Sequence, residues 1–233
     1  MQKLGRVFIS FDIDGTLIAF GGASKNHPLS VCQAFSELFF PIESPEVFLK
    51  HPIDGMTDYV IIKEILEKME QDTSDETIEM VKEKIENIFI GYPMSIPDIL
   101  PGVTKLLEEL SQIPNVTIGI ASGNFPRIGW KKMELTNLIE YFPSKICGMG
   151  LHSSRKNALL EAKEVAERIV GAEFSKCIHI GDTIADHKAA KDAGFIPVIV
   201  KTGRHKEFDI NDGSLIIENF DMGLDTLIEY IQQ

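Results

Sequence analysis

The sequence predicts an α/β protein in which a parallel sheet carries helices on both faces and an all-helical insert follows the first strand. Short apolar runs alternate with helical patterns of about 10 to 15 residues, which is typical of parallel sheets. The interval between the first two of these runs has no strand pattern and is helical instead. The 233 residues, 44% of them hydrophobic, are enough for one α/β domain and a smaller second one.

Four apolar runs are predicted to be buried strands. Each is short and is followed by glycine or a small polar residue, as expected where a strand ends in a turn. They span residues 6–11, 116–121, 177–180 and 196–200. Helical patterns lie on both sides of the second run, between the later runs and near the end of the chain, and they span residues 102–112, 127–138, 156–170, 184–193 and 222–231.

The insert is predicted to be a helical cap domain at 18–97, with the core formed by 1–17 and 98–233. Its helical patterns lie at 29–39, 57–69 and 75–90, and Thr73 or Ser74 can cap the last of them. Open α/β sheets hold their ligands at the ends of the strands, where such an insert emerges. This position favours a lid over the alternative that the helices pack onto the sheet.

Charge and cysteine content exclude several classes of protein. A net charge of −12 argues against nucleic acid and against a polybasic membrane contact. The three cysteines are far apart in the sequence, which argues against a disulfide framework or a zinc site. The apolar runs are too short for a signal peptide or a membrane span. We therefore expect a cytoplasmic protein without nucleic-acid or membrane partners.

The most informative motif is Asp-Ile-Asp-Gly-Thr-Leu at positions 12–17. It follows the first strand, so Asp12 and Asp14 project close together at the strand's carboxyl end. Neighbouring carboxylates repel each other unless a cation lies between them. The same residues can begin a simple turn or a calcium loop, but the later acidic ligands of a calcium loop are missing. The pair therefore predicts a metal site.

Two further motifs follow other strands. Ser122 and Gly123 can offer a hydroxyl and exposed amides to a phosphate, although they also suit an ordinary turn. Asp182 follows the strand at 177–180, and Asp186 lies one helical turn later. Acidic residues at a helix start are also favoured by the helix dipole alone. His179, inside the strand, is predicted to be a packed core residue.

The three motifs together indicate a functional site more specifically than any one of them alone, because the carboxyl ends of parallel strands face one crevice. Four carboxylates, a hydroxyl and glycine amides suit Mg²⁺ and a phosphate. Phosphoryl transfer also needs a positive side chain. Basic residues on two nearby helices are candidates for this role, although each can equally be solvated: Lys131, Lys132, Arg155 and Lys156.

The motifs resemble the signature of the haloacid dehalogenase superfamily of phosphotransferases. Positions 12–17 are similar to its first motif, Ser122 to its second and positions 181–186 to its fourth, with 189–194 similar to the segment that follows. The helical insert, including 53–58, resembles the cap of the phosphoglycolate phosphatase and β-phosphoglucomutase-like branch. The resemblance spans nearly the whole chain and implies a Rossmann-like core with a helical cap.

The resemblance implies a Mg²⁺-dependent phosphatase that hydrolyses a small phosphorylated metabolite. Asp12 would attack phosphorus to form an aspartyl-phosphate, and Asp14 would protonate the leaving oxygen and then assist water. The implied ligands of Mg²⁺ are Asp12, the backbone carbonyl of Asp14, Asp182 and Asp186. The implied phosphate-binding groups are Ser122, Gly123 and either Arg155 or Lys132. The usual Lys-Pro of the third motif is replaced by Ser-Arg-Lys-Asn at 154–157.

Two other functions remain open at this stage. A sugar-phosphate mutase of the β-phosphoglucomutase type would use the same residues. A signalling receiver that carries phosphate on an aspartate shares the parallel sheet, but it needs neither a long helical lid nor an acid two residues after the acceptor. The substrate itself would be contacted by the insert, with His51, Asp54, Thr57 and Asp58 as candidates, although Thr57 or Asp58 can equally cap a helix.

Overall fold

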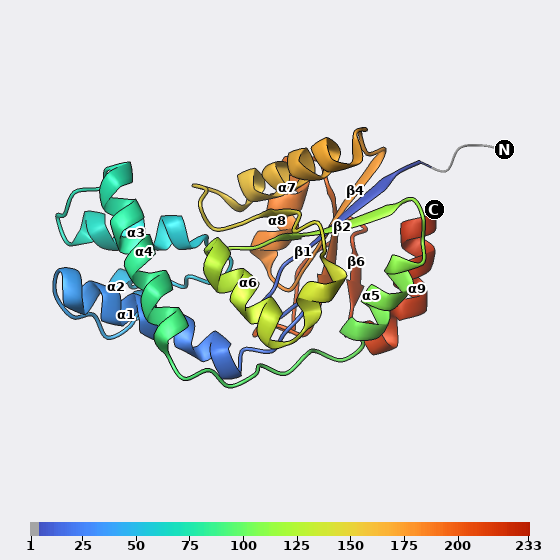
Figure 1. The fold of residues 1–233 in the computed structure, drawn as a ribbon. Helices are drawn as coiled ribbons and strands as arrows, with labels where there is room; N and C mark the ends of the chain where they lie inside the picture. The colour runs from blue at the N-terminus through green and yellow to red at the C-terminus, as the bar shows by residue number, and fades with distance from the viewer. Residues whose placement is uncertain (1–4) are drawn as a thin grey trace.

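The computed structural model describes residues 5–233, so the first four residues of the predicted core segment 1–17 lie outside the described part. Six parallel strands form one sheet in the order β3-β2-β1-β4-β5-β6. They are β1 (Val7–Phe11), β2 (Val116–Ala121), β3 (Cys147–Gly148), β4 (Lys176–Gly181), β5 (Ile196–Val200) and β6 (Leu215–Ile217). Helices cover both faces, and a second helical group lies beyond the end of the sheet (Figure 1). The predicted α/β class is confirmed.

The alternation of side chains along β1 divides the core into two layers. Val7, Ile9 and Phe11 enter one apolar cluster together with residues of α5 (Val103–Ser111) and α9 (Phe220–Gln232). Phe8 points to the other face, into a cluster formed with α7 (Arg155–Val170) and α8 (Ile184–Ala193). Because successive side chains of a strand point to opposite faces, an unbroken apolar run identifies a strand covered on both sides.

The four predicted strands are present, and the remaining differences have local causes. The edge strands β3 and β6 are two and three residues long, too short to give an apolar pattern. Helix α6 (Pro126–Leu135) ends three residues before its predicted limit of 138. Asn137 has a left-handed φ of 58°, which stops the helix, and the 3-10 turn η2 (Leu138–Tyr141) follows.

The helical insert contains η1 (Gly22–Lys25), α1 (Asn26–Leu38), α2 (Pro45–Leu49), α3 (Asp58–Lys68) and α4 (Asp75–Gly91). Its helices form an apolar cluster in which Phe35, Ile62 and Phe89 are fully buried, and which Phe125 and Ile128 of the core join. The helices of the insert do not pack on a face of the sheet (Figure 1). Ser74 caps α4 as predicted, while α2 is too short to give a helical period. In residues 5–233 no helix is long and apolar enough to cross a membrane.

The insert meets the core at the amino end of α3. The backbone amide of Asp58 donates to the carbonyl of Gly123 at 2.9 Å, and that of Tyr59 donates to Gly150 at 3.0 Å. In return, the Phe125 amide donates to the Asp58 carboxylate at 2.7 Å. These contacts hold the insert directly against the loops that leave β2 and β3, at the carboxyl end of the sheet.

Candidate active site

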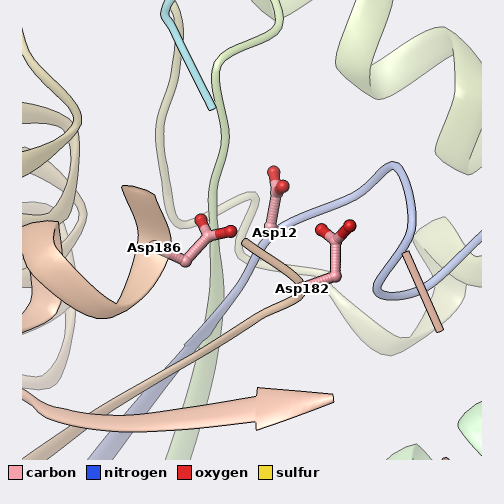
Figure 2. A group of neighbouring side chains, drawn as sticks. All are labelled: Asp12, Asp182 and Asp186. Atoms are coloured by element: carbon pink, nitrogen blue, oxygen red, sulfur yellow. The ribbon is translucent and has the colours of Figure 1, made fainter. Parts of the chain in front are cut away.

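Three buried carboxylates converge at the carboxyl ends of β1 and β4. Asp12 directly follows β1, Asp182 follows β4, and Asp186 lies in the first turn of α8 (Figure 2). One oxygen from each lies within 4.8 Å of the others. The register of the sheet explains this convergence, because Phe11 of β1 pairs with Ile180 of β4, so the residues that follow them leave the sheet side by side.

Glycines allow the chain to approach Asp182 closely. Gly15 turns the chain after β1 with a φ of 81°, and a Cβ there would lie 2.3 Å from Asp182 Oδ2. A Cβ at Gly203 would lie 1.8 Å from the same oxygen. The hydroxyl of Thr16 donates to Asp182 Oδ1 at 3.3 Å. Burial and the charge of Asp12 raise the pKa of Asp182 to about 8, against the opposing effect of Arg155.

The acidic triad has oxygens that protein donors leave unsatisfied. Among the described residues, Asp12 Oδ1 and Asp182 Oδ2 are buried and accept no hydrogen bond. Buried carboxylates that repel one another and lack donors are unfavourable unless a cation joins them. Such hard oxygen ligands suit Mg²⁺, which binds few protein carboxylates together with water and phosphate oxygens. The residues present therefore fit the ion that the sequence predicts.

Asp186 differs from the other two because protein donors hold it. Its Oδ2 accepts from the Thr183 amide at 3.0 Å and from the Thr183 hydroxyl at 2.6 Å. Its Oδ1 lies 3.2 Å from His179 Nε2 and also pairs with Arg155. Thr183 and Asp186 thus form the capping box of α8. This box fixes the carboxylate that faces Asp12.

Replacing Thr183 with Ala should destabilise the protein by about 1–2 kcal/mol, because helix α8 loses its amino-terminal cap. The hydroxyl accepts from the Asp186 amide at 3.1 Å and donates to the Asp186 carboxylate at 2.6 Å, and both of these hydrogen bonds would be lost, while the backbone amide of residue 183 can still donate to Asp186. Urea denaturation would measure the change in free energy of unfolding. Thr183→Ser keeps the hydroxyl and is the matched control. Equal stability of the Ala variant and the wild type would contradict this role.

Two of the four candidate cations reach the site. Arg155 Nη2 lies 3.1 Å from Asp12 Oδ2, and Lys132, only 1% exposed, places Nζ 2.7 Å from Asp14 Oδ2. Lys131 instead pairs with the exposed Glu134, and Lys156 is exposed on α7. The structure therefore places Arg155 beside the candidate nucleophile and Lys132 beside the candidate acid.

Asn124 links Asp14 to the motif after β2, and sequence reasoning did not assign it. Its side-chain amide donates to Asp14 Oδ2 at 2.9 Å and to the Ser122 hydroxyl at 2.8 Å. Its carbonyl oxygen accepts from Lys132 at 2.7 Å. Burial raises the pKa of Asp14, but Lys132 and these donors together bring it below its usual value. No short motif marks Asn124, because Asp14, the carboxylate that it contacts, lies 110 positions away in the sequence.

His179 is buried, as predicted for a packed core residue. Its Nδ1 lies 3.0 Å from the Ser10 hydroxyl, and its Nε2 faces Asp186. Burial, followed by the charge of Arg155, lowers the pKa of His179 to about 3. A neutral imidazole there supports Asp186 from inside the sheet.

A cavity of about 210 Å³ lies between these groups and the insert. Asp54 and Asp58, two of the candidate substrate residues, line it. Thr57 does not line it, and its hydroxyl instead donates to the carbonyl of His152 at 2.6 Å and caps α3. Arg204, which follows β5, also lines the cavity and pairs with Asp54 at 3.1 Å. Sequence reasoning missed Arg204, since nothing near it in the sequence marks a site.

Comparison with known proteins identifies related chains. A family model described as haloacid dehalogenase-like hydrolase matches residues 8–194. A phosphoglycolate phosphatase of Aquifex aeolicus (strain VF5) is 28% identical over 187 residues, which are 80% of each chain. A solved structure from Bacteroides vulgatus, described as a β-phosphoglucomutase, has a TM-score of 0.68 at 18% identity, covering 100% of this chain and 93% of that one. CbbY from Rhodobacter sphaeroides, solved with phosphate, has a TM-score of 0.63 at 17% identity, covering 93% and 95%.

Proposed function

The chain belongs to the haloacid dehalogenase-like hydrolases, and we propose that it is a Mg²⁺-dependent phosphatase that hydrolyses a small phosphorylated metabolite through an aspartyl-phosphate. One observation carries the proposal. Buried carboxylates with unsatisfied oxygens border the same cavity at the carboxyl end of the sheet as the buried Lys132 and the largely buried Arg155. This combination of hard ligands and positive side chains suits a phosphoryl group bound beside a divalent ion.

Mg²⁺ would be held by Asp12, Asp182 and the backbone carbonyl of Asp14, with Asp186 beside them. When bound, the ion would neutralise charge on the phosphoryl oxygens and orient them. Asp186 would add negative charge beside the ion and would not bind it directly, because each of its oxygens already contacts protein donors. Asp12 Oδ1 and Asp182 Oδ2 are the oxygens free to bind the ion.

Asp12 would act as the nucleophile and Asp14 as the proton carrier. A carboxylate oxygen of Asp12 forms a bond to phosphorus while the bond to the leaving oxygen breaks, and Asp14, which takes up a proton when the substrate binds, donates that proton to the leaving oxygen. Water then attacks the phosphorus of the aspartyl-phosphate. Asp14 accepts its proton, and the bond between phosphorus and Asp12 breaks to release phosphate.

The remaining polar groups would hold the phosphoryl oxygens. Ser122 and the amide of Gly123 would donate hydrogen bonds, and Arg155 and Lys132 would supply positive charge. Arg155 already lies 3.1 Å from Asp12, so it is placed to bind a group transferred to that residue. Lys132 is bound to Asp14 and Asn124, and it would mainly orient the acid.

The size of the cavity supports a small substrate. Its volume of about 210 Å³ is below the range of roughly 300–1,000 Å³ that is usual for drug-sized ligands. The insert, proposed as the cap domain 18–97, lines the cavity opposite Asp12, and it would limit the access of water during transfer. We propose that Asp54 and Asp58 face the leaving group, and that Thr57 supports them by capping α3.

A screen for phosphate release across phosphorylated metabolites, with and without Mg²⁺, tests the proposal. We expect release from small monoesters only in the presence of the ion. Product analysis with hexose 1-phosphates and a bisphosphate primer distinguishes the mutase alternative, which would isomerise the sugar phosphate without net release of phosphate. A stable phosphorylated Asp12 without turnover would instead indicate a receiver.

Removal of the ion should abolish turnover and lower stability. EDTA should reduce phosphate release to background, and added Mg²⁺ should restore it. At about 100 times its dissociation constant, the ion should stabilise the folded state by about 2.7 kcal/mol, measured as a shift in thermal unfolding. Asp182→Asn should lose that shift, whereas Asn at the exposed Asp192 should keep it. An unchanged shift in Asp182→Asn would contradict the assigned ligand.

A further inference from the structure

The wall of the cavity opposite Asp12 is apolar and acidic. Its apolar part comes mostly from the insert: Phe20, Pro28, Val31, Ile53, Met56 and Ile61. Three carboxylates of the insert, Glu46, Asp54 and Asp58, share this wall. The leaving group of a phosphate ester bound at Asp12 would extend toward them.

The positive groups that line the cavity are already paired. Lys132 and Arg155 face the carboxylates of the proposed reaction centre. Arg204 stacks on Phe20, 4.7 Å from the ring centroid, and its Nη1 lies 3.1 Å from Asp54 and 3.6 Å from Glu46. One guanidinium is thus shared by two carboxylates, and His205 Nε2 lies 3.7 Å from Asp54, so this part of the wall keeps a negative charge while that imidazole is neutral.

Asp58 adds to the negative charge of this wall. Its Oδ2 accepts from the Phe125 amide and lies 3.0 Å from His27 Nε2. The imidazole of His27 therefore faces a carboxylate of its own. An anionic leaving group would meet like charges here and no unpaired cation, and such an arrangement costs affinity.

A buried hydroxyl beside Asp14 indicates what the wall can bind. Ser24 is 8% exposed, lines the cavity, and its Oγ makes no hydrogen bond of normal geometry. It still lies near enough to Asp14 to help lower the pKa of that carboxyl. Leaving a buried hydroxyl unpaired is unfavourable. A hydroxyl of the leaving group would satisfy it next to the oxygen that Asp14 protonates.

We propose that the cavity selects a phosphate monoester whose leaving group is a neutral, hydroxylated alcohol, and that it disfavours leaving groups with a carboxylate or a second phosphate. The inference rests on the proposed phosphatase function and narrows its substrate class. It separates this chain from its relative named for phosphoglycolate, whose leaving group carries a carboxylate.

Two pairs of esters that differ mainly in charge test the inference. Initial rates with Mg²⁺ would compare ethylene glycol monophosphate with 2-phosphoglycolate, and glycerol 3-phosphate with 3-phosphoglycerate. In each pair, we expect kcat/KM to be at least about tenfold higher for the ester with the uncharged leaving group. The carboxylate of the other leaving group would be repelled by Glu46 and Asp54.

Two variants should change, in opposite directions, the ratio of kcat/KM for the ester with the uncharged leaving group to kcat/KM for its carboxylated partner. Glu46→Gln combined with Asp54→Asn leaves Arg204 without its carboxylate partners and free to bind an anion. The value of kcat/KM for the carboxylated esters should therefore rise toward that for the esters with uncharged leaving groups. Arg204→Gln leaves both carboxylates without their cation and should widen the ratio. Thermal unfolding would verify that both variants remain folded.

The outcomes are distinguishable. Equal or faster hydrolysis of the carboxylated esters by the wild type would overturn the inference and leave the phosphatase function intact. Ratios that do not move in opposite directions in the two variants would also overturn it. If no ester releases phosphate with Mg²⁺, and p-nitrophenyl phosphate does not either, the proposed function is overturned and this inference falls with it.

Discussion

Asp12→Asn should lower kcat/KM for phosphate release by on the order of 10³-fold or more, because the amide cannot form the covalent phospho-intermediate. The change should hardly affect folding. Asp12 is 4% exposed and lies among like charges, and its partner Arg155 retains Asp186. We therefore expect the free energy of unfolding to stay within about 1 kcal/mol of the wild-type value.

Phosphate release and urea denaturation on the same preparation would separate the two effects. Asp192→Asn makes the same chemical change on the exposed side of α8 and should leave both quantities unchanged. Trapping of phosphate on the wild type, but not on Asp12→Asn, would identify the residue that is modified. Turnover by Asp12→Asn at the wild-type rate would exclude Asp12 as the nucleophile.

The sequence predicted the elements that have a strong local pattern. The apolar runs of β1, β2, β4 and β5 were clear because these strands are mostly buried on both faces. The edge strands β3 and β6 and the five-residue α2 are too short to show a period, and they form because neighbouring elements hold them. The helical character of the insert followed from the missing strand pattern between the first two runs, while the cap-domain bounds 18–97 stay a prediction.

The candidate site was predictable where its residues directly follow strands. Parallel pairing of β1 with β4 was enough to bring Asp12 and Asp182 together. The choice among the basic residues was not predictable, because it depends on which face of α6 and α7 meets the crevice. Arg204 was missed for a related reason, since its partner Asp54 lies 150 positions away in the sequence. Pairings of this kind follow from tertiary structure alone.

Lys132→Met should destabilise the protein by about 3–5 kcal/mol and also abolish phosphatase activity. The ammonium is 1% exposed and contacts Asp14 Oδ2 and Asn124 Oδ1, each at 2.7 Å. Methionine fills a similar volume but leaves the Asp14 carboxylate buried without its cation, and an uncompensated buried charge is costly. Urea denaturation would measure the free energy of unfolding, and phosphate release would measure activity.

Two further variants separate this effect from a packing defect. Lys131→Met alters the adjacent position, where the side chain is 35% exposed and pairs with Glu134 at 3.5 Å, so stability should change by less than about 1 kcal/mol. Adding Asp14→Asn to Lys132→Met removes the stranded charge and should recover much of the lost stability, without recovering activity. If the second substitution recovers nothing, the loss arises from packing and the ion pair is not its cause. Recovery of stability alone would show that Lys132 compensates the buried charge of Asp14 and holds its carboxylate in place.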